Sequence, residues 1–157
     1  MVICNAEKRH IPGMIRLLRQ VGAIHAQGRP DLFCQGAQKY NEAQLETLLA
    51  DPSRPIFIAE EDEVLGYCFC QRQTIEENAC VKGRKELYID DLCVDATARG
   101  RHVGTALYGH VQDWAKAEGF AYITLHVWSF NENAEKFYRA MGMENRYICM
   151  EQTLEDA

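Results

Sequence analysis

Short β-rich runs and helical stretches follow one another along the first part of the chain. Residues 2–6 predict a strand. From Ile11 the apolar positions recur every three or four residues, which is the spacing of one helix face. Glycine and proline at 28–30 interrupt this pattern, and a second helical stretch follows Asn41 until the prolines of residues 51–55 end it. This part of the chain therefore predicts one strand followed by two helices.

The middle of the chain predicts a hairpin and a further strand. Residues 56–60 and 64–73 are β-rich and are joined by the acidic turn 61–63. A polar loop follows, and residues 87–94 predict the fourth strand. Regular alternation along this strand would place Asp90 and its neighbour Asp91 on opposite faces of the sheet.

The second half of the chain alternates between helix and strand. It predicts a helix over 104–119, a β-rich run over 122–128, a helix that Asn131 or Asn133 caps and Gly142 ends, and a last strand over 147–153. This order is typical of a mixed α/β or α+β domain with a largely antiparallel sheet. No repeat or linker-like stretch divides the chain, so we expect a single domain over residues 1–157.

Composition and charge narrow the functional classes. The net charge of −6 disfavours a general nucleic-acid-binding role, because such domains are normally basic. No window approaches the roughly 18 to 20 consecutive apolar residues that span a bilayer, and the N-terminus lacks the features of a secretory signal. The seven cysteines are odd in number and scattered. We therefore expect a cytoplasmic protein with reduced thiols and no metal, and a disulfide framework or a zinc site remains the alternative.

The segment 94–107 carries the strongest chemical signal. A strand ends there, glycines and arginines follow, and a helix begins at once. Free N–H groups at a helix N-terminus bind anions, and Gly100 and Gly104 let the backbone approach one closely. The segment lacks the lysine of an ATP-binding P-loop and the three glycines of a dinucleotide loop. It therefore favours a pyrophosphate group bound in another way, although a turn with solvated arginines stays open.

Three motifs in order resemble the GNAT superfamily of N-acetyltransferases. Arg101-x-x-Gly104-x-Ala106 matches their Arg/Gln-x-x-Gly-x-Gly/Ala motif, residues 88–94 are similar to their fourth strand, and residues 131–143 resemble their next motif. The resemblance implies a mostly antiparallel sheet of six to seven strands with about four flanking helices. It also implies that the sheet is splayed between strands four and five, where acetyl-coenzyme A (acetyl-CoA) binds.

The same resemblance assigns cofactor-binding residues. Backbone groups of Leu92, Cys93 and Val94 would pair with pantetheine, and Asn131 would contact the cofactor arm. The amides that would hold the pyrophosphate belong to Arg99, Gly100, Arg101, His102, Val103, Gly104 and Thr105.

Acetyl transfer to an amine needs a base and an acid. Tyr138 matches the tyrosine that protonates the leaving thiolate in this family, so it counts as both cofactor-binding and catalytic; its alternative is a core aromatic role. Asp90 matches a glutamate of polyamine acetyltransferases, and His126 matches the glutamate base of ribosomal-protein alanine acetyltransferases. A histidine with pKa near 6.5 also suits a base. Three possibilities remain open: the base is Asp90, it is His126, or it is neither of these residues.

The acceptor is expected to be an amine held by the first two helices and their connection. The candidate residues are His25, Arg29, Asp31, Phe33 and Tyr40, with Trp128 from after the fifth strand. A polyamine, an aminoglycoside, an amino acid and a protein N-terminus all remain open, because fold does not encode acceptor identity. The resemblance also makes a homodimer plausible. The competing hypotheses are an acyl-CoA-sensing module of the same fold and a nucleotide-binding domain.

Overall fold

The computed structural model describes residues 1–155, which divide by their contacts into two units, residues 1–126 and the part that follows. Each unit is described by itself, and the single domain expected over residues 1–157 stays a prediction. The first unit contains the strands β1 (Val2–Asn5), β2 (Ile56–Glu60), β3 (Val64–Ile75), β4 (Arg84–Val94) and β5 (Tyr122–Leu125), the helices α1 (Ile11–Gly28), α2 (Glu42–Leu49) and α3 (Val103–Ala117), and the 3-10 turns Lys8–His10 and Ala96–Ala98.

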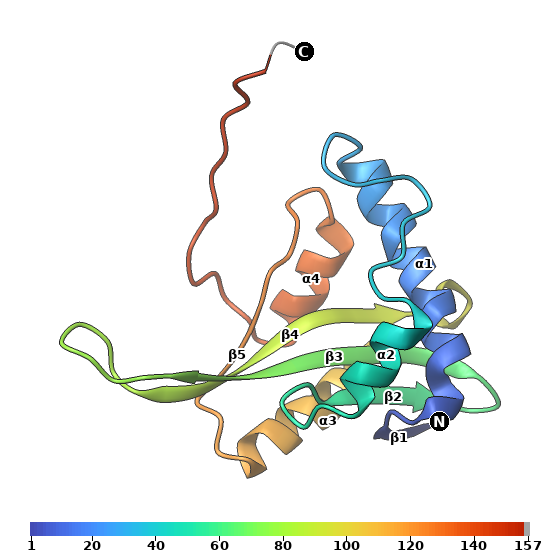
Figure 1. The fold of residues 1–157 in the computed structure, drawn as a ribbon, viewed down its shortest axis with the longest axis horizontal. Helices are drawn as coiled ribbons and strands as arrows, with labels where there is room; N and C mark the ends of the chain where they lie inside the picture. The colour runs from blue at the N-terminus through green and yellow to red at the C-terminus, as the bar shows by residue number, and fades with distance from the viewer. Residues whose placement is uncertain (156–157) are drawn as a thin grey trace. The chain divides into compact units, whose positions relative to one another are not determined.

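The five strands form one sheet in the order β1-β2-β3-β4-β5. The first three pairings are antiparallel and the last is parallel, which confirms the mixed and mostly antiparallel sheet. The β4–β5 ladder ends at Ile89 and Leu125, whereas β4 continues to Val94. The β4–β5 pairing therefore ends where the resemblance expects the splay. Figure 1 also shows the β3–β4 hairpin reaching beyond the neighbouring strands.

Helices cover both faces of this sheet (Figure 1). α1 and α2 share a core with β2 and β3, in which Met14, Leu17 and Leu45 are fully buried. On the other face α3 buries Leu107 and Val111, and the Trp114 ring meets the Phe57 ring edge-on at 5.2 Å. None of the described helices is both long and apolar enough to cross a membrane.

A β-bulge changes the faces of β4. Phe69 of β3 pairs with Asp91, and the next residue of β3 pairs with Ile89, so Asp90 is the extra residue. The expectation that Asp90 and Asp91 point to opposite faces is therefore wrong. Both carboxylates accept hydrogen bonds from tyrosines whose rings pack against Phe69 on the side of α1 and α2.

The second unit contains the helix α4 (Glu132–Ala140). The Asn131 side chain accepts a hydrogen bond from the Ala134 N–H at 3.2 Å, which confirms the predicted cap, and Gly142 follows the helix with a φ of 93°. The strand predicted over 147–153 is wrong, because no described strand pairs with these residues. Ile148 and Met150 are 76% and 88% exposed, so apolar burial does not stabilise a strand there. Within residues 1–155 the sheet accordingly has five strands and not the six to seven expected.

Candidate active site

Asp90 lies at the bulge and holds a primary amine of the same chain. The Lys39 Nζ lies 2.9 Å from Asp90 Oδ1, and the Tyr40 hydroxyl donates to Asp90 Oδ2 at 2.7 Å. The Asp90 side chain is 15% exposed, so it is reachable from solvent. Burial and the Asp90 carboxylate both raise the pKa of Tyr40, which stays a neutral donor. Asp90 is therefore a carboxylate placed to bind an ammonium group.

Asp91 is the second carboxylate at the bulge. It accepts a hydrogen bond from the buried Tyr67 hydroxyl at 2.7 Å. Burial raises the pKa of Asp91 to about 6, and the neighbouring Asp90 charge acts in the same direction, whereas the Tyr67 hydrogen bond and Lys39 oppose the rise. The bulge thus places the partly exposed Asp90 carboxylate beside the Asp91 carboxylate, whose pKa burial raises.

The raised pKa of Asp91 predicts a pH-dependent stability. An acid with a higher pKa in the folded state binds more protons there, so its ionisation costs stability as pH rises from about 4 to about 6. Asp91→Asn keeps an acceptor for Tyr67 and removes that charge. We expect its free energy of unfolding to exceed that of the wild type by up to about 3 kcal/mol at pH 7.5 and to match it near pH 4. Denaturant unfolding at both values checks this, and the same difference at both would contradict it.

His126 follows the end of β5 and contacts β4. Its Nδ1 lies 3.5 Å from the Tyr88 hydroxyl, and the two rings meet edge-on at 5.5 Å. The β4–β5 ladder ends at Ile89 and Leu125, and Asp90 and His126 are the residues that follow these two in the chain. Both sequence candidates for the base therefore lie directly after the last pair of the ladder.

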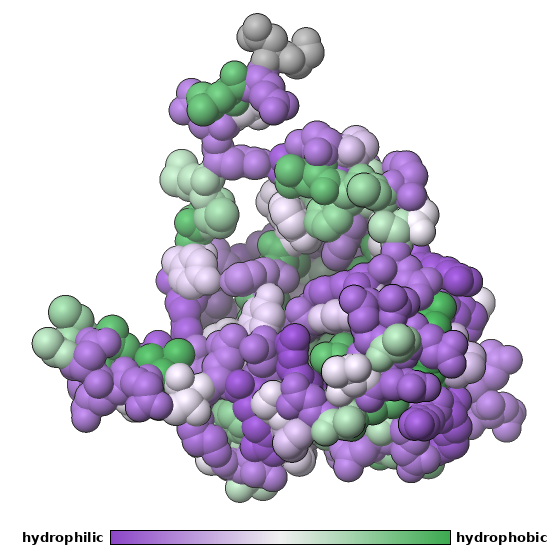
Figure 2. Space-filling view, in the orientation of Figure 1, coloured by the Kyte–Doolittle hydropathy of each residue, from purple (hydrophilic) through white to green (hydrophobic). Residues whose placement is uncertain are grey.

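The acceptor candidates of the first unit cluster at the C-terminal end of α1. The His25 and Phe33 rings lie 5.0 Å apart, and Arg29 donates to both oxygens of Asp31 at 2.8–2.9 Å. Burial lowers the pKa of His25, and the Lys39 ammonium lowers it further. Lys39 therefore acts electrostatically on His25 while it is ion-paired with Asp90. Figure 2 shows apolar surface over the loop after α1, where Leu32 is 52% exposed.

The loop from β4 to α3 has the backbone expected of an anion site. Gly100 has a φ of 81°, and His102 has a φ of 61°, which is left-handed and unusual for a residue with a Cβ. No side chain caps α3, so the N–H groups of its first turn have no helical partner. Asp95 accepts from the Thr97 N–H and is ion-paired with Arg16 of α1, which fixes the start of the loop.

The arginines and the strand residues of the predicted cofactor site lie as follows. Arg101 donates to both carboxylate oxygens of Glu61 at 2.8 Å, so it is ion-paired with the β2–β3 turn. Arg99 lowers the pKa of Cys93, although burial dominates and raises that pKa to about 12. Leu92, Cys93 and Val94 pair with β3 on one edge, and no strand within residues 1–155 pairs with their other edge.

The remaining candidates belong to the second unit. Besides capping α4, Asn131 donates its backbone N–H to the Trp128 carbonyl oxygen at 2.9 Å. The Trp128 ring stacks on the Phe130 ring, with 6.0 Å between their centres. Tyr138 lies in α4 and its ring meets the Phe137 ring edge-on at 5.2 Å. Its backbone carbonyl accepts from the Met143 N–H at 3.0 Å, which holds the turn after the helix. Tyr138 is thus a partly exposed aromatic with a fixed backbone.

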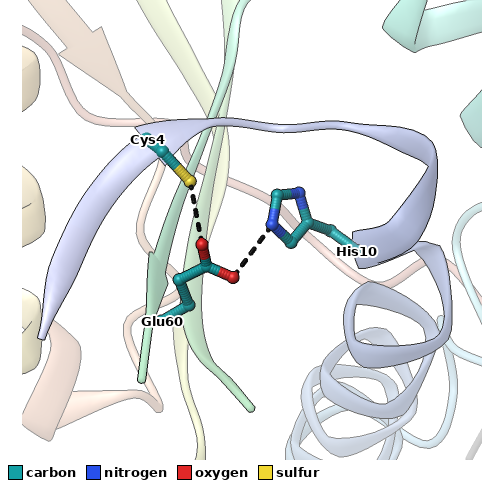
Figure 3. A group of neighbouring side chains, drawn as sticks. All are labelled: Cys4, His10 and Glu60. Carbon is teal, nitrogen blue, oxygen red and sulfur yellow. Dashed lines mark hydrogen bonds and ion pairs between the residues drawn. The ribbon is translucent and has the colours of Figure 1, made fainter. Parts of the chain in front are cut away.

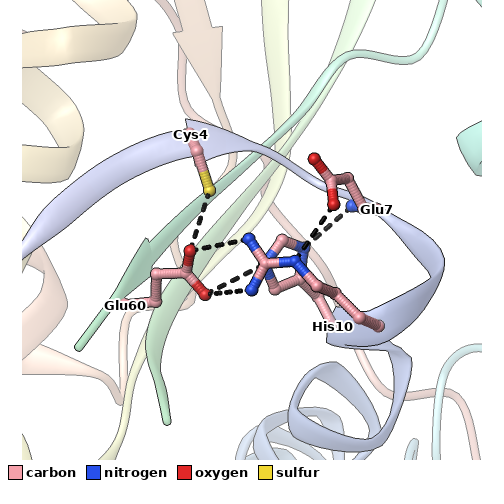
Figure 4. A network of polar contacts seen from close by, with 5 residues as sticks. Cys4, Glu7, His10 and Glu60 are labelled. Atoms are coloured by element: carbon pink, nitrogen blue, oxygen red, sulfur yellow. Dashed lines mark hydrogen bonds and ion pairs between the residues drawn. The ribbon is translucent and has the colours of Figure 1, made fainter. Parts of the chain in front are cut away.

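A separate polar network joins β1, β2 and the start of α1. Cys4, His10 and Glu60 bring their potential ligand atoms within 4.8 Å of one another (Figure 3). Figure 4 shows why these atoms are already engaged: His10 Nδ1 accepts from the Glu7 N–H at 2.8 Å, and Arg9 donates to both oxygens of Glu60 at 2.8 Å. A neutral ring that accepts at Nδ1 carries its proton on Nε2, which lies 3.1 Å from Glu60. We interpret the network as structural.

The Glu60 network predicts a second pH effect. Hydrogen bonds from Arg9, with a smaller effect from His10, lower the pKa of Glu60 to about 2. A depressed pKa contributes stability above the unfolded pKa of about 4.3, and this stability is lost as pH falls toward 2. We expect Glu60→Gln to lower Tm at pH 7 and to have a shrinking effect between pH 4.5 and 2. Calorimetry across this range checks it; a constant difference in Tm would speak against the network.

Sequence reasoning missed Lys39, Asp91 and Tyr67 as members of the site. A signal was present in the adjacent acids Asp90 and Asp91, because two successive carboxylates in an apolar strand cannot both face solvent in a regular strand. Nothing in the sequence indicates the contact between Lys39 and Asp90, since it joins the α1–α2 connection to β4.

Comparison with known proteins agrees with the motifs. Residues 20–143 match the Acetyltransferase (GNAT) family. An uncharacterized N-acetyltransferase of Methanocaldococcus jannaschii is 30% identical over 119 residues, which are 75% of this chain and 51% of that protein. The chain therefore spans about half the length of this curated relative.

Two solved structures resemble the fold over nearly its whole length. A mutant protein of Bacillus halodurans has a TM-score of 0.95 at 26% identity, covering 99% of this chain and all of the other. An aminoglycoside acetyltransferase from an uncultured soil metagenomic sample, solved with trehalose, has a TM-score of 0.72 at 19% identity, covering 98% and 96%. The chain has the three motifs in order, a mixed sheet whose β4–β5 ladder ends at Ile89 and Leu125, and a family match over most of its length. It therefore belongs to the GNAT acetyltransferase family.

Proposed function

We propose that the chain is an acetyl-CoA-dependent N-acetyltransferase that acts on a primary amine, either a small cationic amine or an amine of a peptide or protein. The observation that carries this proposal is the bulge of β4, which presents the Asp90 carboxylate directly after the last pair of the β4–β5 ladder. A carboxylate there suits both binding an ammonium group and accepting its proton.

The donor side fits a coenzyme A pyrophosphate. The first-turn N–H groups of α3 and the left-handed Gly100 and His102 form an uncapped, positively polarised helix start, which favours an anion. The unpaired edge of Leu92, Cys93 and Val94 suits hydrogen bonds to pantetheine amides. Acetyl-CoA supplies an activated acyl group as a thioester when bound. The Arg101 side chain is ion-paired with Glu61, so we assign anion binding to the backbone N–H groups of this loop and not to the arginine side chain.

Asp90 is the base that we favour. An alkyl ammonium has a pKa near 10.4 and must lose a proton before its nitrogen can attack. The Asp90 carboxylate already binds such a group, and Tyr40 fixes its second oxygen. His126 Nδ1 lies 3.5 Å from the Tyr88 hydroxyl. We place His126 second as a base, because Asp90 is the candidate whose carboxylate contacts an ammonium group directly.

Tyr138 is the acid that we propose for the leaving thiolate, on the strength of its place in the family motif. A phenol is protonated at neutral pH and can donate to a developing thiolate. Asn131 caps the same helix through the Ala134 N–H, and this supports a role in orienting α4. We therefore assign Asn131 and Tyr138 to the cofactor side.

Direct attack in a ternary complex is favoured over a covalent enzyme intermediate. Cys93 is the cysteine of the predicted cofactor strand, and burial keeps its pKa at about 12, so it stays a thiol near neutral pH. Its Sγ lies 3.8 Å from the Leu17 carbonyl, toward α1. A protonated, buried thiol is a poor acyl acceptor.

The acceptor side supports a cationic substrate. Asp90 and Asp91 offer negative charge, and His25, Phe33, Arg29 and Asp31 form the neighbouring end of α1. Trp128 is assigned to the same role from the second unit. We also propose a homodimer and a cytoplasmic location; the seven free cysteines support a reducing compartment.

The test is a panel of amines incubated with protein and acetyl-CoA, with products identified by mass spectrometry. The panel contains polyamines, aminoglycosides, amino acids and short peptides. We expect at least one cationic amine to gain an acetyl group. Acetyl-CoA that binds without turnover would favour the alternative function of an acyl-CoA-sensing module, and absence of binding would overturn the proposal.

A further inference from the structure

Lys39 occupies the place that a substrate amine is expected to take. Its Nζ lies 2.9 Å from Asp90 Oδ1, 3.5 Å from the Asp90 backbone carbonyl oxygen and 5.7 Å from the centre of the Tyr40 ring. A carboxylate, a carbonyl and an aromatic face are the three groups that recognise a primary ammonium. The contact therefore has the chemistry of substrate binding as well as that of an ion pair.

The Lys39 charge also reaches the other residues of the acceptor side. It lowers the pKa of Asp91 at the bulge and contributes to the lowered pKa of His25 in α1. The ammonium thus lies among residues from α1, the α1–α2 connection and β4.

The segment that carries Lys39 is held on both sides of this residue, and the Lys39 side chain itself is largely exposed. It connects α1 to α2 without helix or strand, and the Lys39 side chain is 47% exposed. At Gly22 of α1 an added Cβ would lie 2.3 Å from the Ala37 carbonyl oxygen, so the connection packs directly on that glycine. The Lys39 side of the ion pair is in contact with solvent, where an ammonium can exchange with another cation.

We propose that Lys39 is an internal acceptor and that the enzyme acetylates it. The inference rests on the proposed function. Asp90 takes one proton from the Lys39 ammonium, and the nitrogen attacks the carbonyl carbon of the thioester. The N–C bond forms as the C–S bond breaks, and a second proton from the nitrogen ends on the sulfur. The products are N-acetyl-Lys39, coenzyme A as a thiol and one proton held by Asp90.

Acetylation of Lys39 changes what Asp90 can bind. An acetylated lysine is neutral and cannot form an ion pair, so the carboxylate becomes available to an external cation. The unmodified Lys39 competes with substrate and the modified one does not. The modification is therefore expected to raise the affinity for cationic amines.

The first test incubates the protein with acetyl-CoA and no other amine, followed by intact-mass and peptide mass spectrometry. We expect one acetyl group on Lys39, at a rate independent of protein concentration, and a loss of most of it in Asp90→Asn. Lys39→Arg removes the site. Lys85→Arg is the matched control, because Lys85 donates to the Glu118 carbonyl at 2.7 Å away from Asp90. Heat-denatured protein measures uncatalysed acetylation.

The second test needs no turnover. n-Butylamine and the uncharged n-butanol are titrated into wild type and Lys39→Met without acetyl-CoA, with binding read by NMR shifts. If the Lys39 ammonium occupies Asp90 for about nine-tenths of the time, Lys39→Met should bind butylamine about tenfold more tightly than the wild type does. The affinity for butanol should be the same in both proteins. Equal butylamine affinity in both proteins would overturn the occupancy by Lys39. An unmodified Lys39 in protein that acetylates a small amine would overturn the inference alone, whereas a failed amine panel would overturn the proposed function.

Discussion

Asp90→Asn is expected to lower kcat/KM for a cationic primary amine by about 10² to 10³-fold, the range of a general base. Asparagine has nearly the same shape and still accepts the Tyr40 hydroxyl, but it carries no charge and takes no proton. The substrate ammonium therefore loses both its partner and its proton acceptor. Steady-state kinetics with saturating acetyl-CoA measure the effect, and acetyl-CoA affinity should not change.

Two comparisons keep the Asp90 prediction specific. Asp62→Asn removes a carboxylate from the exposed β2–β3 turn, and it should leave kcat/KM within about twofold. The loss in Asp90→Asn should also shrink at high pH, where more of the substrate is already neutral. A loss that stays the same across pH would assign Asp90 to structure and not to proton transfer.

Tyr138→Phe is expected to lower kcat by about 10²-fold while the Kd for acetyl-CoA stays the same. Phenylalanine keeps the ring that meets Phe137 and removes only the hydroxyl group, which carries the proton. Tyr122→Phe, which changes an exposed tyrosine of β5, is the matched control. Rapid-mixing kinetics that isolate the acetyl-transfer step measure the effect.

A change of leaving group separates the acid role of Tyr138 from a packing role. A thioester of a more acidic thiol needs less protonation as its C–S bond breaks, so the defect of Tyr138→Phe should become several-fold smaller with such a donor. A defect of equal size with both donors would contradict the assignment and favour a core aromatic role for Tyr138.

The order of elements could be predicted from the sequence because local signals coincide with it. Asn41 and Asn131 cap α2 and α4 through their own side chains, and the turn 61–63 joins β2 and β3 as expected. The strand predicted over 147–153 was wrong because a strand also needs a neighbouring strand to pair with. The composition of residues 147–153 carries no information on such a partner.

The candidate site was less predictable, for a physical reason. Alternation along β4 assumes a regular ladder, and the bulge between Phe69 and Cys70 breaks it. The sequence therefore indicated Asp90 without showing that Asp91 shares its face. Lys39, Tyr40 and Asp90 meet only through the packing of the α1–α2 connection on β4, which no local pattern encodes.

A crystal structure with coenzyme A and a bound primary amine tests the account most directly. We predict the amine nitrogen within hydrogen-bond distance of Asp90 Oδ1, where the Lys39 Nζ otherwise lies, with Lys39 displaced into solvent. The pyrophosphate should accept from the N–H groups at the start of α3. An amine bound elsewhere, with Lys39 still on Asp90, would contradict the account.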